Sequence, residues 1–425
     1  MNVNDGICVG IDLCADYSQL SYCKLNNEEP VSVEFYTNTS KSNLFTPTVV
    51  SKTIGMEQWY AGDEADTSGK LGEAVLVKDL LRKVVDKNPV QVDDVTIMPL
   101  DLLNIFFGYL LQAAKADADC DNILMVSVTL RDYNISVLKA VVKSLENLGI
   151  ERDRIITSSH DESYIYYTIN QSEDLWKNDV FLFDYDDMGL VTKRFYIAPG
   201  RGQRIVMVHS EDYTEEVSAK LIENTASGEY LDRRLLEIAT KLFEKKNIST
   251  VYLTGKYFSD EIDMPDFIKF ICERRRVFAG NNLYCKGACF QARQAVTDCG
   301  PKDMLLACRE RITTGIEMKI SDHGKDKILK MVKPGVNWFG ADCSYEFIVD
   351  NIDEIEIFLS PVDSMEKQVV KVSLADFPDR KNKTMRIAIS FSFTSDSRCY
   401  MMVKDMGFGE FFASSGMVIN EELLL

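Results

Sequence analysis

The chain has 425 residues, 46% of them hydrophobic and 27% charged, which is an ordinary globular composition with length for two or three domains. Its formal net charge of −18 repels phosphate backbones and anionic lipid headgroups, so we expect no nucleic-acid partner and no membrane-surface binding. No apolar run approaches the roughly 20 residues that span a bilayer, and the first residues are polar, so the sequence predicts no membrane insertion and no signal peptide.

The first predicted element is a short apolar strand, 7–12, that ends in the carboxylate of Asp12. Closely spaced strands follow, as in an antiparallel meander. Helical periodicity begins at Ala74 and continues to Val84, and helices and strands then alternate as in parallel α/β folds. The predicted segments are strands at 18–25, 31–36, 57–61, 122–128 and 155–156, and helices at 100–115, 137–148 and 161–169.

The same layout restarts with a second apolar strand, 179–184, which also ends in an aspartate, Asp184. The segments that follow are strands at 192–198, 203–209 and 250–253, and helices at 230–245 and 287–296. Two halves that each open on an aspartate-tipped strand and continue into a meander indicate an internal structural repeat.

After residue 300 the pattern becomes alternating strands separated by turn residues, and no further helix is predicted beyond residue 312. The strands are expected at 354–359, 369–374, 385–393 and 400–404. This segment is predicted to be a separate all-β domain, a sandwich.

The eleven cysteines are scattered, and the close pairs Cys8/Cys14 and Cys285/Cys289 lack a second cluster that would complete a zinc site. Reduced, mostly buried thiols in a cytoplasmic protein are the simplest interpretation. The three histidines, His160, His209 and His323, are expected to be structural or exposed.

Short motifs along the whole chain are similar to those of a known family. In the first part they are VGIDL at 9–13, PTVV at 47–50, GDEA at 62–65, VSV at 126–128, SGEYLDRRL at 227–235 and GACFQA at 287–292. In the second part they are DMLL at 303–306, TGIE at 314–317, VKPG at 332–335 and VKDMGFG at 403–409. In this order they resemble motifs of the 70-kDa heat-shock chaperones, members of the actin, hexokinase and heat-shock ATPase superfamily.

The resemblance implies an α/β actin-like (ribonuclease-H-like) two-lobed nucleotide domain at 1–300, with lobes at about 1–170 and 171–300. A linker at 301–312 and a β-sandwich at 313–425, resembling the chaperone peptide-binding domain, would follow. It implies catalytic roles for Asp12, Lys78 and Asp184, with Asp12 and Asp184 binding a metal ion through water. The positions that would contact the cofactor are Asp16, Gly189, Gly228 and Gly255, and Phe347 and Ile355 would line the peptide site.

Both phosphate loops depart from the family's pattern. Cys14-Ala15-Asp16 replaces a Gly-Thr-Thr run, so a Cβ and a carboxylate stand where backbone N–H groups should approach phosphate. The glycines after Asp184 are replaced by Asp186, Asp187 and Met188, which read either as a cation site, a lost phosphate site or a solvated hairpin tip. The stretch 234–255 is too short for the family's adenine lobe, and the glutamate expected near Ser159 and His160 is missing.

These departures leave several functions open. The first is a pseudo-ATPase with chaperone architecture that binds a protein or extended peptide, or serves as a scaffold. The second is a divergent ATPase that uses Asp12, Asp184 and Lys78, with ATP and magnesium as cofactors only if the cleft is functional. A filament-forming role is the third. Lys78 could equally be a solvated helix residue, and Phe347 and Ile355 ordinary core. No helical lid precedes Leu425, so no peptide trapping by a lid is expected, and the apolar tail at 421–425 could dock on the protein itself or a partner.

Overall fold

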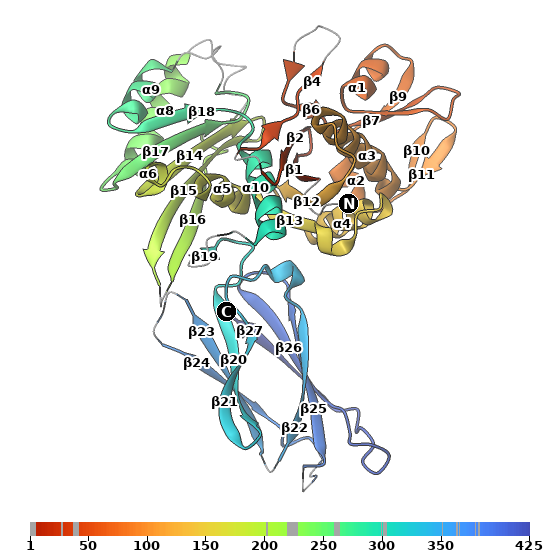
Figure 1. Ribbon diagram of the computed structural model, residues 1–425, viewed down its shortest axis with the longest axis vertical. Coiled ribbons are helices and arrows are strands. Elements are labelled where there is room, and N and C mark those ends of the chain that lie inside the picture. Colours follow the sequence, from red (N-terminus) through yellow and green to blue (C-terminus); the bar gives the residue numbers. More distant parts are fainter. Residues whose placement is uncertain are drawn as a thin grey trace. The chain divides into compact units, whose positions relative to one another are not determined.

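The computed structural model in Figure 1 describes residues 6–26, 29–36, 42–200, 203–218, 228–258, 264–298, 300, 304–350, 352–362, 364, 366–378, 380 and 383–425. It divides into two compact units. Unit 1 comprises 1–196 and 208–302, and unit 2 comprises 197–207 and 303–425. Among the described residues, no helix is both long and apolar enough to cross a membrane.

The first half of unit 1 is built on a mixed sheet with the strand order β13-β12-β1-β2-β3, called the first sheet below. Its strands are β1 (Ile7–Leu13), β2 (Tyr17–Lys24), β3 (Val31–Ser32), β12 (Ile123–Leu130) and β13 (Ile155–Ser159). β12 and β13 run parallel to β1, whereas β2 and β3 are antiparallel neighbours. Smaller strands are β4 (Phe35–Tyr36), β5 (Ser42–Asn43), β6 (Thr46–Pro47), β7 (Val50–Thr53), β8 (Trp59–Ala61), β9 (Ala74–Val77), β10 (Val90–Val92) and β11 (Val95–Ile97).

Two helices of this half have a capping side chain at their first turn. The helical segments of this half are α1 (Gly62–Lys70), α2 (Leu80–Asp86), α3 (Pro99–Ala118), α4 (Ile135–Asn147), a 3₁₀ turn at Arg152–Arg154, α5 (His160–Ile169) and α6 (Glu173–Trp176). The Asn134 side chain accepts from the backbone N–H of Ser136 and caps α4, and the Ser159 hydroxyl does the same for α5 through Glu162. Phe106, Phe107 and Leu110 of α3 are fully buried, as its apolar stripe predicts.

The second half of unit 1 contains most of a sheet of similar layout, called the second sheet below. Its full order is β18-β17-β14-β15-β16-β19, and its last strand, β19 (Met304–Ala307), and the first residues of β16 belong to unit 2. Its elements are β14 (Asp179–Asp186), β15 (Gly189–Pro199), β16 (Arg204–Asp212), α8 (Gly228–Phe243), β17 (Ile248–Thr254), α9 (Pro265–Cys272), β18 (Arg276–Ala279) and α10 (Leu283–Thr297). β17 and β18 continue in parallel from β14, and β15 is antiparallel to it. Each sheet is thus a meander extended by two parallel strands on the other side of its first strand.

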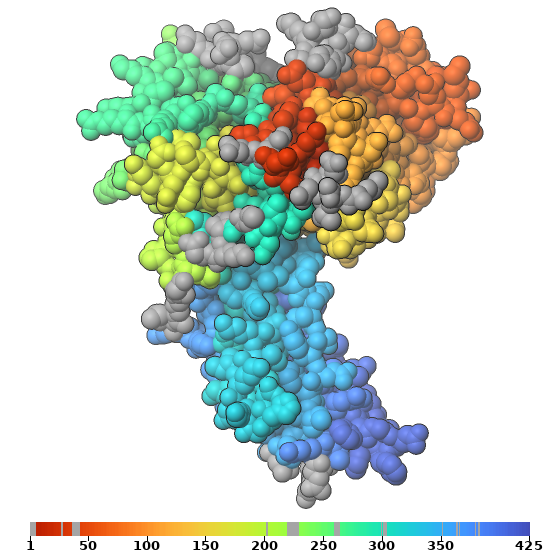
Figure 2. Space-filling model, viewed as in Figure 1, coloured from red at the N-terminus to blue at the C-terminus, as the bar shows by residue number. Residues whose placement is uncertain are grey.

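Helix α10 packs against β1, β2, β12 and α5, although its residues fall in the range predicted for the second lobe. Figure 2 shows the red residues near the start of the chain beside the green residues of α10 on the face turned to the viewer. A Cβ at Gly10 of β1 would lie 2.2 Å from the Cys285 carbonyl oxygen and 2.3 Å from the Cys289 nitrogen. Only glycine permits this close approach of helix and strand.

Unit 2 consists mainly of two four-stranded β-sheets, and β19 belongs to neither of them. Its strands are β19 (Met304–Ala307), β20 (Thr314–Asp322), β21 (Lys325–Val332), β22 (Cys343–Val349), β23 (Glu354–Pro361), β24 (Gln368–Ser373), β25 (Met385–Phe393), β26 (Arg398–Asp405) and β27 (Val418–Leu424). The two sheets have the orders β21-β20-β23-β24 and β22-β25-β26-β27. Apart from the strands, the described part of this unit has a single 3₁₀ turn, Trp338–Gly340.

Three sequence expectations need correction or relocation. Residues 74–77 form strand β9, paired with β7, because Ala-Val-Leu-Val extends beside Val50; helix α2 begins only after Asp79, whose φ is 57°. The apolar tail docks on the protein itself, since Val418–Leu424 pairs with β26. In the predicted linker, 301–303 lie outside the described residues, and Met304–Ala307 is a strand that pairs in parallel with Arg204–Met207.

Candidate functional site

A cavity of about 540 Å³ lies in unit 1, where the aspartate-tipped strands β1 and β14 end. The carboxyl ends of parallel strands in open sheets are the usual place for a ligand. The described residues that line it include six carboxylates and three cations, so its formal charge is −3 when His160 is neutral. The carboxylates are Asp12, Asp16, Asp132, Asp184, Asp186 and Asp187, and the cations are Arg82, Arg131 and Lys256.

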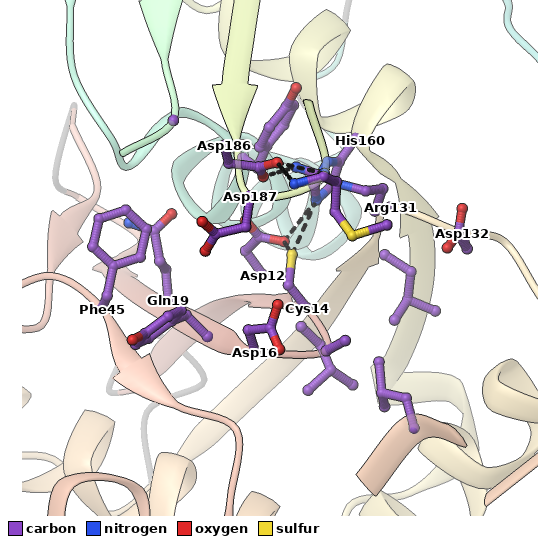
Figure 3. Close-up of a pocket in the computed structure, with 18 of the residues that line it drawn as sticks. Asp12, Cys14, Asp16, Gln19, Phe45, Arg131, Asp132, His160, Asp186 and Asp187 are labelled. Carbon is purple, nitrogen blue, oxygen red and sulfur yellow. Dashed lines mark hydrogen bonds and ion pairs between the residues drawn. The ribbon is translucent and has the colours of Figure 1, made fainter. Parts of the chain in front are cut away.

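Asp12, the last polar residue of β1, is buried and bound by side chains of the protein itself. Its Oδ1 lies 2.7 Å from Nε2 of His160, the first residue of α5, and accepts from the Cys14 thiol at 3.5 Å. Cys14 Sγ is also 3.9 Å from the same His160 nitrogen. Burial, followed by the neighbouring Asp12 carboxylate, raises the pKa of the Cys14 thiol well above its usual value. Figure 3 shows these three side chains converging on one side of the cavity.

Asp184 of β14 is also buried and is also bound by side chains of the protein itself. The Tyr284 hydroxyl of α10 donates to its Oδ2 at 2.8 Å, and the Arg131 guanidinium lies 3.6 Å from the same oxygen. Burial raises the pKa of Asp184, and the Arg131 charge opposes that rise. The Tyr284 ring also stacks on His160, with ring centroids 3.7 Å apart and an interplanar angle of 13°. The two aspartate-tipped strands are therefore linked through one stacked aromatic pair.

Arg131 follows β12 directly and reaches the second sheet. It donates to both carboxylate oxygens of Asp186, through Nη1 at 3.0 Å and through Nη2. This two-point contact is the strong form of an arginine–carboxylate pair. Burial opposes the charge of Arg131, but Asp184 and Asp186 together raise the pKa of its guanidinium. The sequence predicted the acidic run but not the cation that neutralises it.

The remaining acid of the run, Asp187, is bound at the hairpin end by Lys256 and by the Tyr257 hydroxyl at 2.5 Å. Burial would raise the pKa of Asp187, but the Lys256 and Tyr257 hydrogen bonds hold it below its usual value. Arg82, the third cation of the lining, lies 3.9 Å from Asp86. Each cation among the described lining residues thus has a carboxylate partner, whereas Asp16 and Asp132 are exposed and lie apart from the Arg131–Asp186 pair in Figure 3.

Two family profiles account for almost the whole chain. Residues 29–309 match the C-terminal region of a family of unknown function, DUF5716, and residues 311–425 match a domain of unknown function, DUF8552. The chain belongs to the DUF5716 family. A search of curated proteins gives no match.

The residues predicted for the nucleotide site are brought together only in part. Asp12, Asp16, Asp184 and Gly255 line the cavity of this DUF5716 protein. Lys78 is exposed in the connection between β9 and α2, and Gly189 and Gly228 begin β15 and α8; these three are not among the described residues that line the cavity. The serine before Gly228 in the quoted motif, Ser227, lies outside the described residues.

The two glycines near the second sheet have local structural reasons. Gly255 has φ 95°, and a Cβ there would lie 2.3 Å from the Tyr185 carbonyl oxygen. Gly189 has φ 114° and closes the β14–β15 hairpin opposite Asp186, with Thr214 within 3 Å of where a Cβ would stand. The positive φ and the close neighbouring atoms explain both glycines without any ligand.

In the sandwich, the two predicted peptide-contact residues lie on different sheets. Ile355 of β23 is buried core, and Phe347 of β22 is half-buried and stacks on Tyr345 with centroids 6.4 Å apart. A surface that sequence reasoning missed is the connection between β26 and β27, where Phe411 is 93% exposed and Phe408 and Phe412 are each exposed by more than a third.

Arg131, Tyr284 and the role of His160 were not predicted. Arg131 had a usable signal, because it follows the predicted strand 122–128 at the end where parallel strands present ligand-binding groups. Tyr284 lies in the first turn of α10, and no spacing in the sequence connects it with Asp184.

Proposed function

We propose that this DUF5716 protein is a heat-shock-chaperone-like pseudo-ATPase that acts as a protein- or peptide-binding module. The pseudo-ATPase part of this proposal rests on the Arg131–Asp186 pair and on the excess of acidic residues that line the cavity. The shared strand order of the two sheets supports the architectural resemblance. The motifs along the chain and this strand order are those expected of a protein descended from an actin-like ancestor.

Electrostatics disfavour a nucleoside triphosphate in this cavity. The cations that could meet phosphate, Arg131 and Lys256, already have carboxylate partners. At an effective dielectric of about 20, each like-charge pair at about 4 Å costs about 4 kcal/mol. That is close to three decades of affinity for each carboxylate left facing a phosphate.

The test is calorimetric titration of the full chain with ATP and magnesium in zinc-free buffer. We expect no binding in the micromolar range. A micromolar dissociation constant would reject the pseudo-ATPase, and phosphate release that Asp12→Ala and Lys78→Ala both abolish would establish the divergent ATPase in its place. The exposed position of Lys78, outside the cavity lining, weighs against that second outcome.

The binding half rests on the connection 406–417, called the aromatic loop below. Its phenylalanines are exposed, yet its ends are tied to the buried Asp405. The Asp405 carboxylate accepts from the backbone N–H of Gly407 at 2.9 Å and of Ser415 at 2.7 Å. The backbone carbonyl of Asp405 accepts from the Ser414 hydroxyl. Exposed aromatic groups on a fixed frame lose little entropy on binding, which suits an interaction surface.

The partner that fits is an extended apolar segment of another protein, because the chain's charge of −18 disfavours anionic lipid. Fluorescence anisotropy with labelled apolar peptides would measure it. Phe411→Ser should weaken binding about tenfold or more, whereas Ile328→Ser, which also removes an exposed apolar side chain but on β21, should leave it unchanged. Equal effects of the two variants would reject the aromatic loop as the binding surface.

A further inference from the structure

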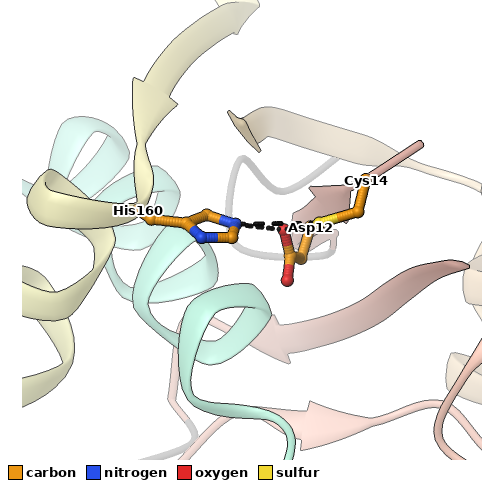
Figure 4. Close-up of side chains that lie close together, drawn as sticks. All are labelled: Asp12, Cys14 and His160. Carbon is orange, nitrogen blue, oxygen red and sulfur yellow. Dashed lines mark hydrogen bonds and ion pairs between the residues drawn. The ribbon is translucent and has the colours of Figure 1, made fainter. Parts of the chain in front are cut away.

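Asp12, Cys14 and His160 form a group of three metal-ligating side chains. They come from the end of β1, the turn after it and the first residue of α5, and Figure 4 shows their polar atoms pointing toward one another. The three ligand atoms lie within 4.8 Å of one another. The group mixes a thiol, an imidazole and a carboxylate, so it is neither a simple acidic cluster nor an isolated cysteine.

The triangle of ligand atoms has nearly the size of a face of a tetrahedral zinc site. Bonds of about 2.3 Å to sulfur and about 2.0–2.1 Å to nitrogen and oxygen put tetrahedral ligand atoms about 3.3–3.6 Å apart. Here Sγ lies 3.5 Å from Oδ1 and 3.9 Å from Nε2, while Nε2 and Oδ1 are 2.7 Å apart. The last edge is short because the two atoms share a hydrogen, which an ion would displace. Opening this edge by about 0.6 Å and shortening the Sγ–Nε2 edge by about 0.3 Å completes the face.

The donor chemistry and the charge select the ion. A thiolate and a carboxylate supply a charge of −2 beside a neutral imidazole, which matches a divalent cation. Thiolate and imidazole favour zinc over magnesium, which prefers oxygen ligands and its own water. The nearby Arg131 does not leave an unbalanced positive charge, because Asp184 and Asp186 neutralise it.

The surroundings hold the ligands in place and leave one side open. The His160 ring is stacked on Tyr284, which fixes its plane, and the Ser159 cap fixes the first turn of α5. All three side chains line the cavity, so a fourth position would face it. Three protein ligands with an open fourth position is the pattern of reactive, as opposed to purely structural, zinc sites.

We propose that Asp12, Cys14 and His160 bind one Zn²⁺ whose fourth coordination position faces the cavity. This site differs from the magnesium site that the resemblance implied, because Asp184 is held by Tyr284 and Arg131 and takes no part. It goes beyond the binding function proposed above and depends on neither peptide nor nucleotide.

Cobalt titration of the full, reduced chain tests it, since tetrahedral Co²⁺ bound to thiolate gives intense visible bands and a near-ultraviolet charge-transfer band. We expect one equivalent to produce both bands and Zn²⁺ to abolish them. Cys14→Ser should eliminate the charge-transfer band, and His160→Gln should weaken cobalt binding about 100-fold, at least as much as losing an outer-shell partner does. Cys272→Ser, which removes an exposed thiol elsewhere in unit 1, should change nothing.

A measurement on the unaltered chain guards against variants that fail to fold. Zn²⁺ should slow alkylation of Cys14 at least about tenfold, read by mass spectrometry, while alkylation of Cys272 in the same sample stays unchanged. Absence of the cobalt bands, or equal alkylation of Cys14 with and without Zn²⁺, would overturn the site. ATP binding would reject the pseudo-ATPase without touching these results, because no nucleotide is present in them.

Discussion

Arg380→Met should destabilise the sandwich strongly, because it removes the partner of its buried carboxylate. Arg380 donates to both oxygens of Asp405 at 2.7 and 2.9 Å, and the two side chains are 7% and 0% exposed. The amide and hydroxyl groups of the aromatic loop also point at this carboxylate. Methionine keeps the apolar stem of the arginine but leaves a buried negative charge with neutral donors only.

The magnitude follows from two limits. Breaking one side of a buried ion pair costs about 3–5 kcal/mol. The variant can escape by protonating Asp405, whose ordinary pKa is 3.8, and at pH 7 this proton costs about 4 kcal/mol. We therefore expect a loss of about 3–4 kcal/mol in the free energy of unfolding of unit 2 at neutral pH.

The stability that Asp405 contributes depends on pH in a direction that its pKa determines. In the native chain burial would raise the pKa of Asp405, but Arg380 and the Ser415 and Gly407 hydrogen bonds hold it well below its ordinary value. The stability it contributes is present above pH 3.8 and is lost as the pH falls further. In Arg380→Met the folded pKa is raised, so protonation relieves the variant on acidification. The difference between the two proteins should therefore shrink from pH 7 toward pH 4.

Hydrogen–deuterium exchange read by mass spectrometry gives the assay, because it resolves unit 2 within the full chain. A loss of about 3–4 kcal/mol should speed exchange of β25 and β26 amides about 10²- to 10³-fold. Arg398→Met is the matched control, since its pair with Glu422 is about half exposed and is worth less than about 1 kcal/mol. Equal exchange in the two variants, or a difference that grows on acidification, would show that Arg380 does not stabilise the buried Asp405 carboxylate.

Three further predictions concern unit 1, with stability measured by differential scanning calorimetry. Arg131→Met leaves Asp184 and Asp186 without their cation and should cost about 1–3 kcal/mol, less than a fully buried pair because Arg131 is one quarter exposed; an unchanged transition would contradict the ion-pair assignment. Gly10→Ala places a Cβ against the backbone of α10 and should cost about 3 kcal/mol or prevent folding. Gly108→Ala lies inside α3, where the nearest atom to the added Cβ is 3.9 Å away, and should instead stabilise unit 1 by about 0.5–1 kcal/mol. A lower unfolding temperature for this variant would show that the added methyl group does not fit there.

Local pattern was enough to predict the elements that position the site. The apolar runs ending in Asp12 and Asp184 are strands β1 and β14, since four or five apolar residues followed by a carboxylate indicate a buried strand near its end. Periodicity failed at 74–77, where four apolar residues fit a helix or a strand equally. Pairing with Val50, 27 residues away in sequence, decided for the strand.

The partners of the carboxylates could not be predicted, because they are set by contacts distant in sequence. His160 meets Asp12 across 148 residues and Tyr284 meets Asp184 across 100. The acidic run at 184–187 looked like a cation site or a solvated tip because Arg131 and Lys256 belong to other elements. The charge of a residue can be read from the sequence, whereas the charge that the fold places beside it cannot.

These pairs compensate the buried aspartates of the cavity with side chains of the protein itself. A buried carboxylate needs a compensating donor or cation, and in a functioning nucleotide site part of that compensation comes from the ligand and its metal. Here His160, Tyr284 and Arg131 supply it from three separate elements. A ligand that binds only the native state raises stability in proportion to its occupancy. If the buried carboxylates of the cavity need no nucleotide for compensation, millimolar ATP and magnesium should leave the unfolding temperature of unit 1 unchanged. Arg131→Met should lower that temperature under the same conditions.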